Sequence, residues 1–411
     1  MRDYRNRAEM ATQFRAMSGM PKGEDRVGGC IEVVPFYRHT YHKKDLGKGL
    51  GVNHTNSFIV KNASVAAGEI DSRALNHAAT SQSATIELNP EHRAFGANLC
   101  YHQCLSSLYE GLYFGLNTAI AQDGRRDNLA VTGTNAAAVK LLLVKTASQN
   151  GRYTETTWEN KIGLESPEVC LGYKFFDNDS GNASLNIAGV LATGTDPNIE
   201  LVNEPVVGGK NFGLGAGLTG CANLMDNENS SFKVFFDANY RYFFKRDVKT
   251  IPGLKGLVAA EANGNWGHLY KLNATGNPTV ANYYGQDAEV TPGSMFDGYA
   301  MLCYCMDNFC LDFGYHAEFR QSHTAKPKTA FVITKHYKAA ADAAGTDLAA
   351  TNLNWKREQM FISRFFVGAG MNMKDWDYPV LFGVGGLVDV ANKKQITPEN
   401  WEVYGKVGIC F

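Results

Sequence analysis

The sequence lacks several features that would each define a class of protein. It has no run of about 20 apolar residues, the length a transmembrane helix needs, and the best apolar run, residues 136–144, contains Lys140. Its charge is balanced, with 40 Lys and Arg against 41 Asp and Glu, which excludes the strongly basic surface of a dedicated nucleic-acid binder. Aromatic residues make up 11% of the chain, too many for a disordered protein. Helical membrane proteins and nucleic-acid partners are therefore not expected.

Metal and cofactor motifs are missing as well. The nine cysteines do not form the Cys-x-x-Cys or His-x3-5-His pairs of a structural zinc site, so we expect no metal and no cofactor. The segment from Met1 to Arg7 is charged and is not followed by an apolar stretch, so no secretory signal is visible.

Strict alternation of apolar and polar residues dominates what is present. In residues 309–320, the odd positions are Phe, Leu, Phe, Tyr, Ala and Phe, and the even positions are Cys, Asp, Gly, His, Glu and Arg. A period of two over this length predicts a β-strand with two different faces. We expect about fourteen such strands, within a range of 12–16. They cover residues 30–42, 53–62, 85–105, 108–121, 169–175, 184–191, 212–224, 233–244, 256–261, 298–306, 309–320, 360–372, 381–390 and 401–411.

The polar faces indicate where these strands lie. They carry mostly Gly, Ser, Asn, Cys and isolated charges of both signs, where a soluble sandwich would present Lys, Glu and Thr to water. Aromatic residues gather at the ends of the apolar faces, and many strands have the 9–11 residues that cross a bilayer when tilted. The sequence therefore predicts an all-β fold, a transmembrane antiparallel β-barrel with short helical segments in the N-terminal arm and in one long connection.

The last strand adds a more specific pattern. Trp401, Val403, Gly405, Val407, Ile409 and Phe411 alternate with more polar residues, and Phe411 ends the sequence. This resembles the carboxy-terminal signature of bacterial outer-membrane β-barrels, although Gly405 stands one place earlier than the usual glycine. The resemblance implies the bacterial outer membrane as location and lipid and the barrel-assembly machinery as partners. The residues that would carry the assembly signal are Phe411, Ile409, Val407 and Gly405.

Within barrels, the chain is similar to porins and, distantly, to channels of the long-chain fatty-acid transporter type. A porin-like function implies passive diffusion of small hydrophilic solutes through the lumen, without catalysis. Charges that face lipid would cost about 2–4 kcal/mol each at the midplane, so charged residues in strands should point inward and line the pore. By parity, the predicted pore-lining residues are Lys174, Lys233, Asp237, Arg241, Asp312, His316, Glu318, Arg320, Arg364, Asp389, Glu402 and Lys406.

Two other functions stay open. A plugged transporter for hydrophobic substrates would use residues 1–28 as an arm or plug before a barrel of residues 29–411, with an apolar lumen around Phe235 and Phe243. A structural, lattice-forming envelope protein would instead have a blocked lumen, and a homo-oligomer is possible in either case. We also expect helical segments at residues 2–20 and 135–147 and an extracellular loop at residues 322–354 that could narrow the pore.

Histidines and cysteines on the inward faces suggest two further questions. His316 and His102 have no nucleophile that the sequence identifies as a partner, so a catalytic site is not expected. Inward parity of the cysteines allows either cross-links between adjacent strands or small lumen fillers. The cysteines with inward parity are Cys100, Cys104, Cys170, Cys221, Cys310 and Cys410.

Overall fold

A computed structural model of the protein describes most of the chain. The described residues are 28–50, 55–61, 69–71, 83–146, 149–150, 152–196, 201–250, 253–254, 286–328, 353–354, 356–357, 359–373, 376–391 and 399–411. The predicted N-terminal arm, residues 1–28, and the predicted strand 256–261 therefore lie almost entirely outside the described residues. None of the helices within the described ranges is long and apolar enough to cross a membrane.

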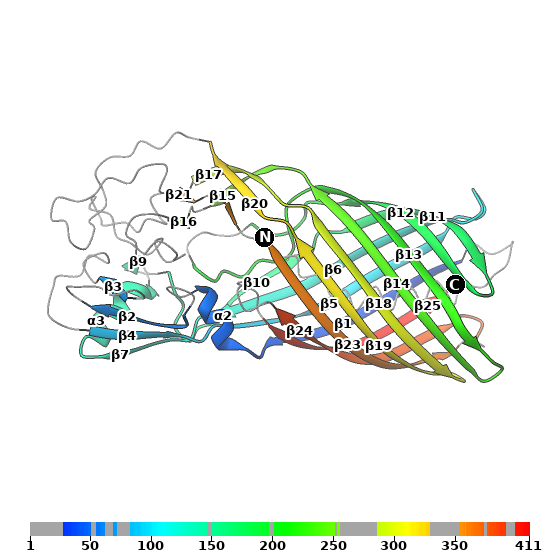
Figure 1. The fold of residues 1–411 in the computed structure, drawn as a ribbon, viewed down its shortest axis with the longest axis horizontal. Coiled ribbons are helices and arrows are strands. Elements are labelled where there is room, and N and C mark those ends of the chain that lie inside the picture. Colours follow the sequence, from blue (N-terminus) through cyan, green and yellow to red (C-terminus); the bar gives the residue numbers. More distant parts are fainter. Residues whose placement is uncertain are drawn as a thin grey trace.

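Twelve antiparallel strands form a closed barrel (Figure 1). In chain order they are β1 (Gly29–Thr40), β5 (Glu91–Cys104), β6 (Leu112–Arg126), β11 (Glu168–Asn178), β12 (Gly181–Val190), β13 (Gly213–Asp226), β14 (Ser230–Phe243), β18 (Met295–Met306), β19 (Phe309–Arg320), β23 (Met360–Met373), β24 (Val380–Ala391) and β25 (Asn400–Cys410). Each strand pairs with its neighbours in this list, and β25 pairs with β1. Closure leaves no edge of unpaired backbone groups, as a strand-built membrane protein requires.

A thirteenth strand, β10 (Glu159–Leu164), extends the wall on one side. It pairs with residues 120–125 of β6, whereas β11 pairs with residues 112–117 of the same edge. The two strands therefore share one side of β6, and β10 lies outside the closed ring of twelve.

The last residue completes the seam between the first and last strands. Phe411 accepts a hydrogen bond from the backbone N of Gly29 at 2.7 Å and donates one to the Gly29 oxygen at 2.8 Å. The Phe411 ring covers Gly29 so closely that a Cβ at this position would lie 2.8 Å from the ring. Glycine at position 29 thus permits the contact that ends the barrel.

The two ends of the barrel differ in their connections. Hairpins such as those at residues 179–180 and 307–308 lie at one end together with Gly29 and Phe411, and we call this the short-turn end. Every connection at the opposite end, the long-loop end, spans eight residues or more of the sequence. Short turns with both termini on one side and long loops on the other are typical of outer-membrane barrels.

Small sheets extend from the long-loop end (Figure 1). One contains β2 (Ser57–Lys61), β3 (Glu69–Asp71), β4 (Ser83–Leu88) and β7 (Leu129–Gly133), and another contains β15 (Arg246–Thr250), β17 (Gln286–Thr291), β20 (His323–Pro327) and β22 (Lys356–Arg357). Two-stranded pairs join β8 (Lys145–Thr146) with β9 (Gln149–Asn150) and β16 (Gly253–Leu254) with β21 (Leu353–Asn354). The helices among the described residues are α2 (Lys43–Leu50) and α3 (Ala136–Leu143).

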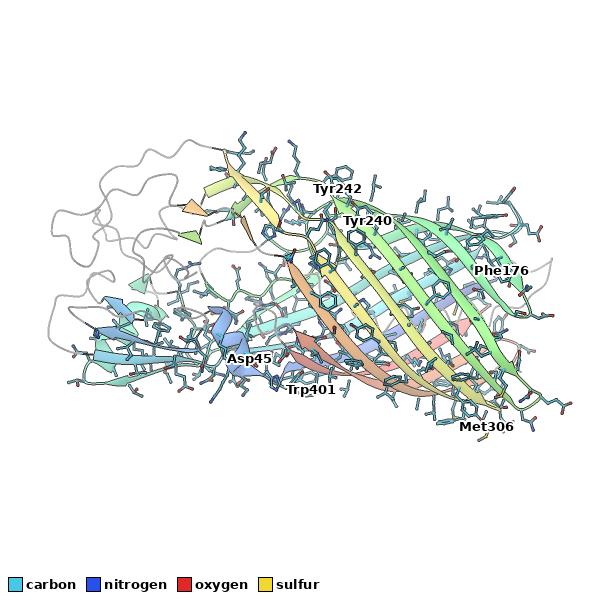
Figure 2. All side chains as sticks on the ribbon, viewed as in Figure 1. Asp45, Phe176, Tyr240, Tyr242, Met306 and Trp401 are labelled. Carbon is cyan, nitrogen blue, oxygen red and sulfur yellow. A yellow bond between two sulfur atoms is a disulfide. The ribbon has the colours of Figure 1, made fainter. Side chains whose placement is uncertain are left out.

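The outer face of the barrel is apolar, with aromatic residues toward both ends. Tyr240, Phe296 and Phe319 are directly paired across β14, β18 and β19 near the long-loop end, with ring centroids 4.7 and 6.5 Å apart along the row. Figure 2 shows Tyr240, Tyr242 and Trp401 toward this end and Phe176 and Met306 at the other. Exposed Leu, Val and Ile occupy the band between them. This outer surface has the apolar chemistry of a wall that faces lipid.

Differences from the sequence prediction concern the number and limits of strands. The barrel has twelve strands, at the lower limit of the expected range, because the predicted strand 53–62 is β2 of a small sheet. The predicted strand 85–105 is two strands, β4 and β5, separated at Asn89 and Pro90. Helix α3 agrees with the helix expected at 135–147, whereas α2 was not expected, and the predicted loop 322–354 begins with strand β20.

Candidate functional site

The inner face of the barrel carries most of the residues that parity assigned to the lumen. Nine of the twelve are buried, with exposed fractions of 1–6%, while their outward neighbours such as Leu311, Phe313 and Val367 are 46–58% exposed. The nine are Asp237, Arg241, Asp312, His316, Glu318, Arg364, Asp389, Glu402 and Lys406.

Arg241 on β14 is one of the most enclosed inward charges. It is 1% exposed, and its guanidinium donates to Glu168 on β11 through Nε and Nη2 at 2.5 and 2.8 Å. Its Nη1 donates to both oxygens of Asp297 on β18 at 2.6 and 3.1 Å. One planar guanidinium thus links two carboxylates from different strands, a geometry that a lysine cannot reproduce.

Arg364 on β23 organises a second network across four strands. Its Nε donates to Asp389 on β24 at 2.9 Å, and its Nη1 lies 3.1 Å from Glu318 and 3.0 Å from Nδ1 of His316, both on β19. Glu318 also accepts a hydrogen bond from Arg320 Nε at 2.6 Å. Asn400 on β25 donates to Asp389 at 3.2 Å and extends the network to the last strand.

Two further pairs add to the charged lining. Arg38 on β1 contacts Glu402 on β25 through Nε and Nη2 at 2.8 and 2.7 Å, and Lys406 on β25 lies 3.3 Å from Asp312 on β19. Except for this last pair, the interacting residues are near the long-loop ends of their strands, and we call them the charge girdle. The charge girdle consists of Arg38, Glu168, Arg241, Asp297, His316, Glu318, Arg320, Arg364, Asp389 and Glu402.

Three predicted residues lie apart from these networks. Lys174 is half-buried near the short-turn end and pairs with Asp177 of its own hairpin at 3.0 Å. Lys233 is also half-buried and stands opposite Asn223 on one side and Cys303 on the other. Asp237 is buried, and its Oδ2 accepts a hydrogen bond from Asn239 at 2.8 Å.

Sequence reasoning missed three members of the charge girdle. Arg38 stands at an inward position of a strand that was predicted but not assigned by parity, and the alternation Glu32, Val34, Phe36, Arg38 would have found it. Asp297 and Glu168 each directly precede a predicted strand, 298–306 and 169–175, whereas the observed strands begin earlier and include them.

The other half of the inner face, toward the short-turn end, has a different composition. Phe235, Met301 and Cys303 are 1–2% exposed and belong to one buried apolar cluster with Phe36, Phe366 and Tyr404. We call the half of the inner face toward the short-turn end the thiol half. Its cysteines near the strand ends are Cys30, Cys100, Cys104, Cys221, Cys303, Cys305, Cys310 and Cys410.

A disulfide joins two of these cysteines, Cys305 and Cys310, directly opposite each other in the β18–β19 hairpin. Cross-linking of adjacent strands, one of the two possibilities left open by the sequence, therefore occurs at this hairpin.

Two groups of side chains in the described residues have the spacing of metal ligands. Cys303 lies with Cys305 and Cys310, two of which form the disulfide, and His42 lies with Asp45 and Glu399 at the long-loop end. In the second group the His42 ring contacts Glu399 and is exposed on its other side. Neither group has the closed tetrahedral N/S ligand set of a structural zinc site.

The mouth at the long-loop end contains a buried carboxyl with a shifted pKa. Burial raises the pKa of Asp127 to about 7, even though Thr154 donates hydrogen bonds to its Oδ2 from N at 2.7 Å and from Oγ1 at 3.1 Å. These hydrogen bonds join the start of the connection after β6, at Asp127, to Thr154 later in the same connection. The contact is therefore sensitive to protonation near neutral pH.

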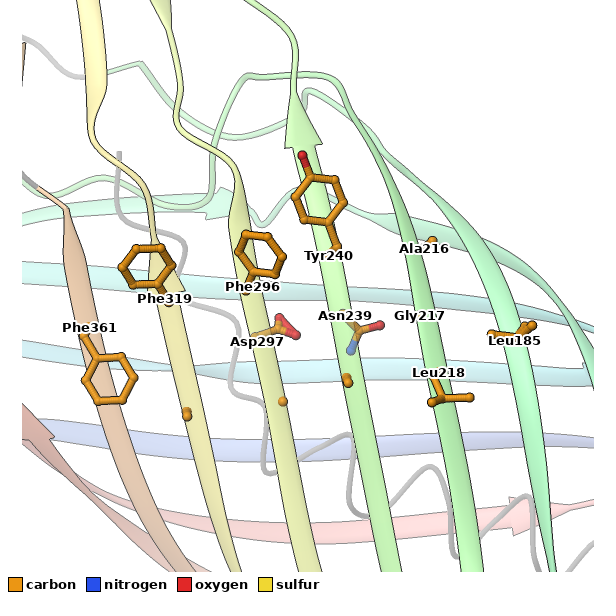
Figure 3. A pocket seen from close by; sticks show the side chains of 13 residues that line it. Leu185, Ala216, Gly217, Leu218, Asn239, Tyr240, Phe296, Asp297, Phe319 and Phe361 are labelled. Carbon is orange, nitrogen blue, oxygen red and sulfur yellow. The ribbon is translucent and has the colours of Figure 1, made fainter.

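A shallow groove of about 520 Å³ lies on the outer wall (Figure 3). Its aromatic edge is the row Tyr240, Phe296, Phe319 and Phe361, and its floor includes a row of directly paired small residues, Ala238, Gly298 and Ala317. Because the aromatic rings are exposed on the outer face, the groove faces the lipid.

Comparisons with known proteins find similarity of architecture. No protein-family model and no curated protein matches the sequence. Among solved structures, the chain is similar to an outer membrane channel from Pseudomonas putida F1 at 10% identity and a TM-score of 0.44, covering 95% of this chain and 99% of that one. It is also similar to a FadL homologue of Pseudomonas aeruginosa at 8% identity and a TM-score of 0.30, covering 94% and 90%.

A third similar structure is the outer membrane channel DcaP of Acinetobacter baumannii, at 9% identity and a TM-score of 0.28, covering 93% and 97%. At these scores no substrate or site residue is carried over. The closed barrel, its apolar outer face with aromatic ends and the position of its short turns make this chain an outer-membrane β-barrel.

Proposed function

We propose that the protein is a porin-like channel that lets small hydrophilic solutes diffuse across the outer membrane. The observation that supports this proposal is the charge girdle, in which four arginines and five carboxylates from eight strands face the lumen. Such a ring of fixed charges costs desolvation energy in a closed interior, and it is useful where hydrated solutes or ions must pass.

The pairing within the charge girdle bears on selectivity. Because the arginines are paired with carboxylates, the field they create is local, and preference for one ion sign depends on the residues at the margins. Arg320 is such a residue, since its side chain is 16% exposed and it shares Glu318 with Arg364. Asp237 is a second, between the charge girdle and the thiol half.

Liposome swelling measures the proposed diffusion directly. Proteoliposomes containing the purified barrel should swell in isotonic solutions of small neutral sugars at rates that fall with sugar size, and liposomes without protein should not. Equal, background swelling for all sugars from a barrel that shows heat-modifiable gel mobility would contradict the hydrophilic-channel proposal.

A second function, transport of hydrophobic substrates, is favoured by the apolar side chains on the inner face. Phe235 is 1% exposed and stands opposite Met301, and Phe366 and Tyr404 belong to the same cluster. Swelling at background level together with saturable uptake of a fluorescent fatty acid would favour this function, and Phe235→Ala should then alter the uptake.

Assembly of the barrel is proposed to depend on the end of β25. Val407, Ile409 and Phe411 are 42–50% exposed on the outer face, where an assembly machine can read their side chains before lipid covers them. Gly405 lies on the same face with an intermediate exposure. No catalytic role is proposed, because the His316 ring already contacts Arg364 and sits in an ion-pair network.

A further inference from the structure

Cys30 and Cys410 face each other across the seam that closes the barrel. Cys30 is the second residue of β1, Cys410 is the last residue of β25, and the two are directly opposite in the register. The adjacent pair, Gly29 and Phe411, exchanges both backbone hydrogen bonds, so the cysteines form a non-hydrogen-bonded pair. In antiparallel sheets such pairs bring the Cα atoms to about 4.5 Å and the side chains closest together.

The two sulfur atoms are close and enclosed. The Cys30 and Cys410 Sγ atoms are 2.8 Å apart, and the residues are 3% and 8% exposed. Their arrangement repeats that of Cys305 and Cys310, which also face each other on adjacent antiparallel strands and are joined. We propose that Cys30 and Cys410 form a second disulfide, which closes the first and last strands of the barrel covalently.

The reaction requires an oxidant, which we identify by class as a protein or small-molecule disulfide. The thiolate of one cysteine attacks a sulfur of that disulfide, forms a mixed disulfide and releases one thiolate of the oxidant. The thiolate of the second cysteine then attacks the first cysteine's sulfur and releases the oxidant's other thiolate. Two thiols lose two electrons and two protons, and the oxidant becomes a dithiol or two thiols. The short-turn end faces the periplasm in outer-membrane barrels, where disulfides form and persist.

Position in the chain makes this disulfide different from the hairpin disulfide. Cys305 and Cys310 are 5 residues apart, whereas Cys30 and Cys410 are 380 residues apart. The pair can meet in register only after β25 has paired with β1, so the bond forms after closure and then prevents the seam from opening. It is a lock on the assembled barrel, independent of the solute that crosses it.

Peptide mapping of the full-length protein, taken from membranes under alkylating and non-reducing conditions, tests the proposal. Trypsin cleavage after Arg26, Arg38 and Lys406 gives peptides 27–38 and 407–411, each with a single cysteine. We expect these peptides to be linked to each other and the link to disappear on reduction. Cys305 and Cys310 fall within one tryptic peptide, so their bond serves as an internal control for oxidation.

Three results would overturn the proposal. One is alkylated Cys30 and Cys410 in a digest that contains the Cys305–Cys310 bond, and the second is a link from peptide 27–38 to peptide 94–125, which carries Cys100. Gel mobility gives the third, because boiled, unreduced wild-type chain should migrate faster than reduced chain. Cys30→Ser and Cys410→Ser should both abolish this shift, the matched control Cys305→Ser should keep it, and a shift that survives Cys30→Ser would refute the assignment.

Discussion

The two halves of the inner face fill the inside of the barrel with different kinds of side chains. Toward the long-loop end, Arg241 and Arg364 hold carboxylates from neighbouring strands. Toward the short-turn end, Phe235, Met301 and Cys303 belong to an apolar cluster, and the buried pair of Asp312 and Lys406 lies beside it. The outer face is the same apolar surface along both halves. The difference shows that the membrane dictates only the outward residues, whereas the inward residues are free to specialise within one continuous wall.

The largest effect should come from removing an arginine of the charge girdle. Arg241→Met leaves Glu168 and Asp297 buried without their shared partner, and breaking a buried ion pair in this way costs about 3–5 kcal/mol. Urea unfolding of the detergent-solubilised barrel, followed by heat-modifiable gel mobility, measures the loss. Lys328→Met, which removes an exposed pair with Asp247, is the control and should leave the free energy of unfolding nearly unchanged. Equal costs for both substitutions would contradict the distinction between girdle and surface charges.

A truncation in the thiol half should lower the free energy of unfolding because it removes buried side-chain volume, not because it breaks an ion pair. Met301→Ala removes a fully buried side chain and should cost about 2–5 kcal/mol in the same unfolding assay. Met301→Leu preserves the volume and should cost less than about 1.5 kcal/mol, whereas Arg241→Lys should remain costly because lysine lacks the planar fork. The comparison would be contradicted if Arg241→Lys left the free energy of unfolding unchanged and Met301→Leu lowered it strongly.

A smaller effect, a dependence of local stability on pH, is expected at the mouth of the barrel. Burial raises the pKa of Asp127 to about 7, above its unfolded value of 3.8, so the folded state retains a proton that the unfolded state releases. The associated stability is present below about pH 4 and is lost as pH rises through 7. Hydrogen exchange at residues 152–154 should therefore speed up from pH 5 to 8, after correction for intrinsic rates. Asp127→Asn should flatten that dependence, and an unchanged profile would show that Asp127 does not titrate in this range.

Sequence patterns predicted the wall of the barrel better than its interior. Alternation located all twelve barrel strands, because each outward position must be apolar in lipid. It placed the start of β18 too late to include Asp297, and it counted strand β2, whose alternation serves a small sheet outside the barrel. Parity could place Arg364 inside, yet the partners Glu318 and Asp389 depend on register between strands, which no single strand encodes.

The central proposal is that solutes pass the charge girdle. The reversal potential of single channels in a salt gradient tests it most directly. Arg320→Glu exchanges a positive for a negative charge at the margin of the charge girdle and should shift the reversal potential toward cation preference, and Asp237→Lys should shift it toward anions. Lys328→Glu makes the same change in charge on the small sheet outside the barrel and should leave it unchanged. Identical reversal potentials for Arg320→Glu, Asp237→Lys and Lys328→Glu, or no conductance from the folded wild-type barrel, would contradict the account.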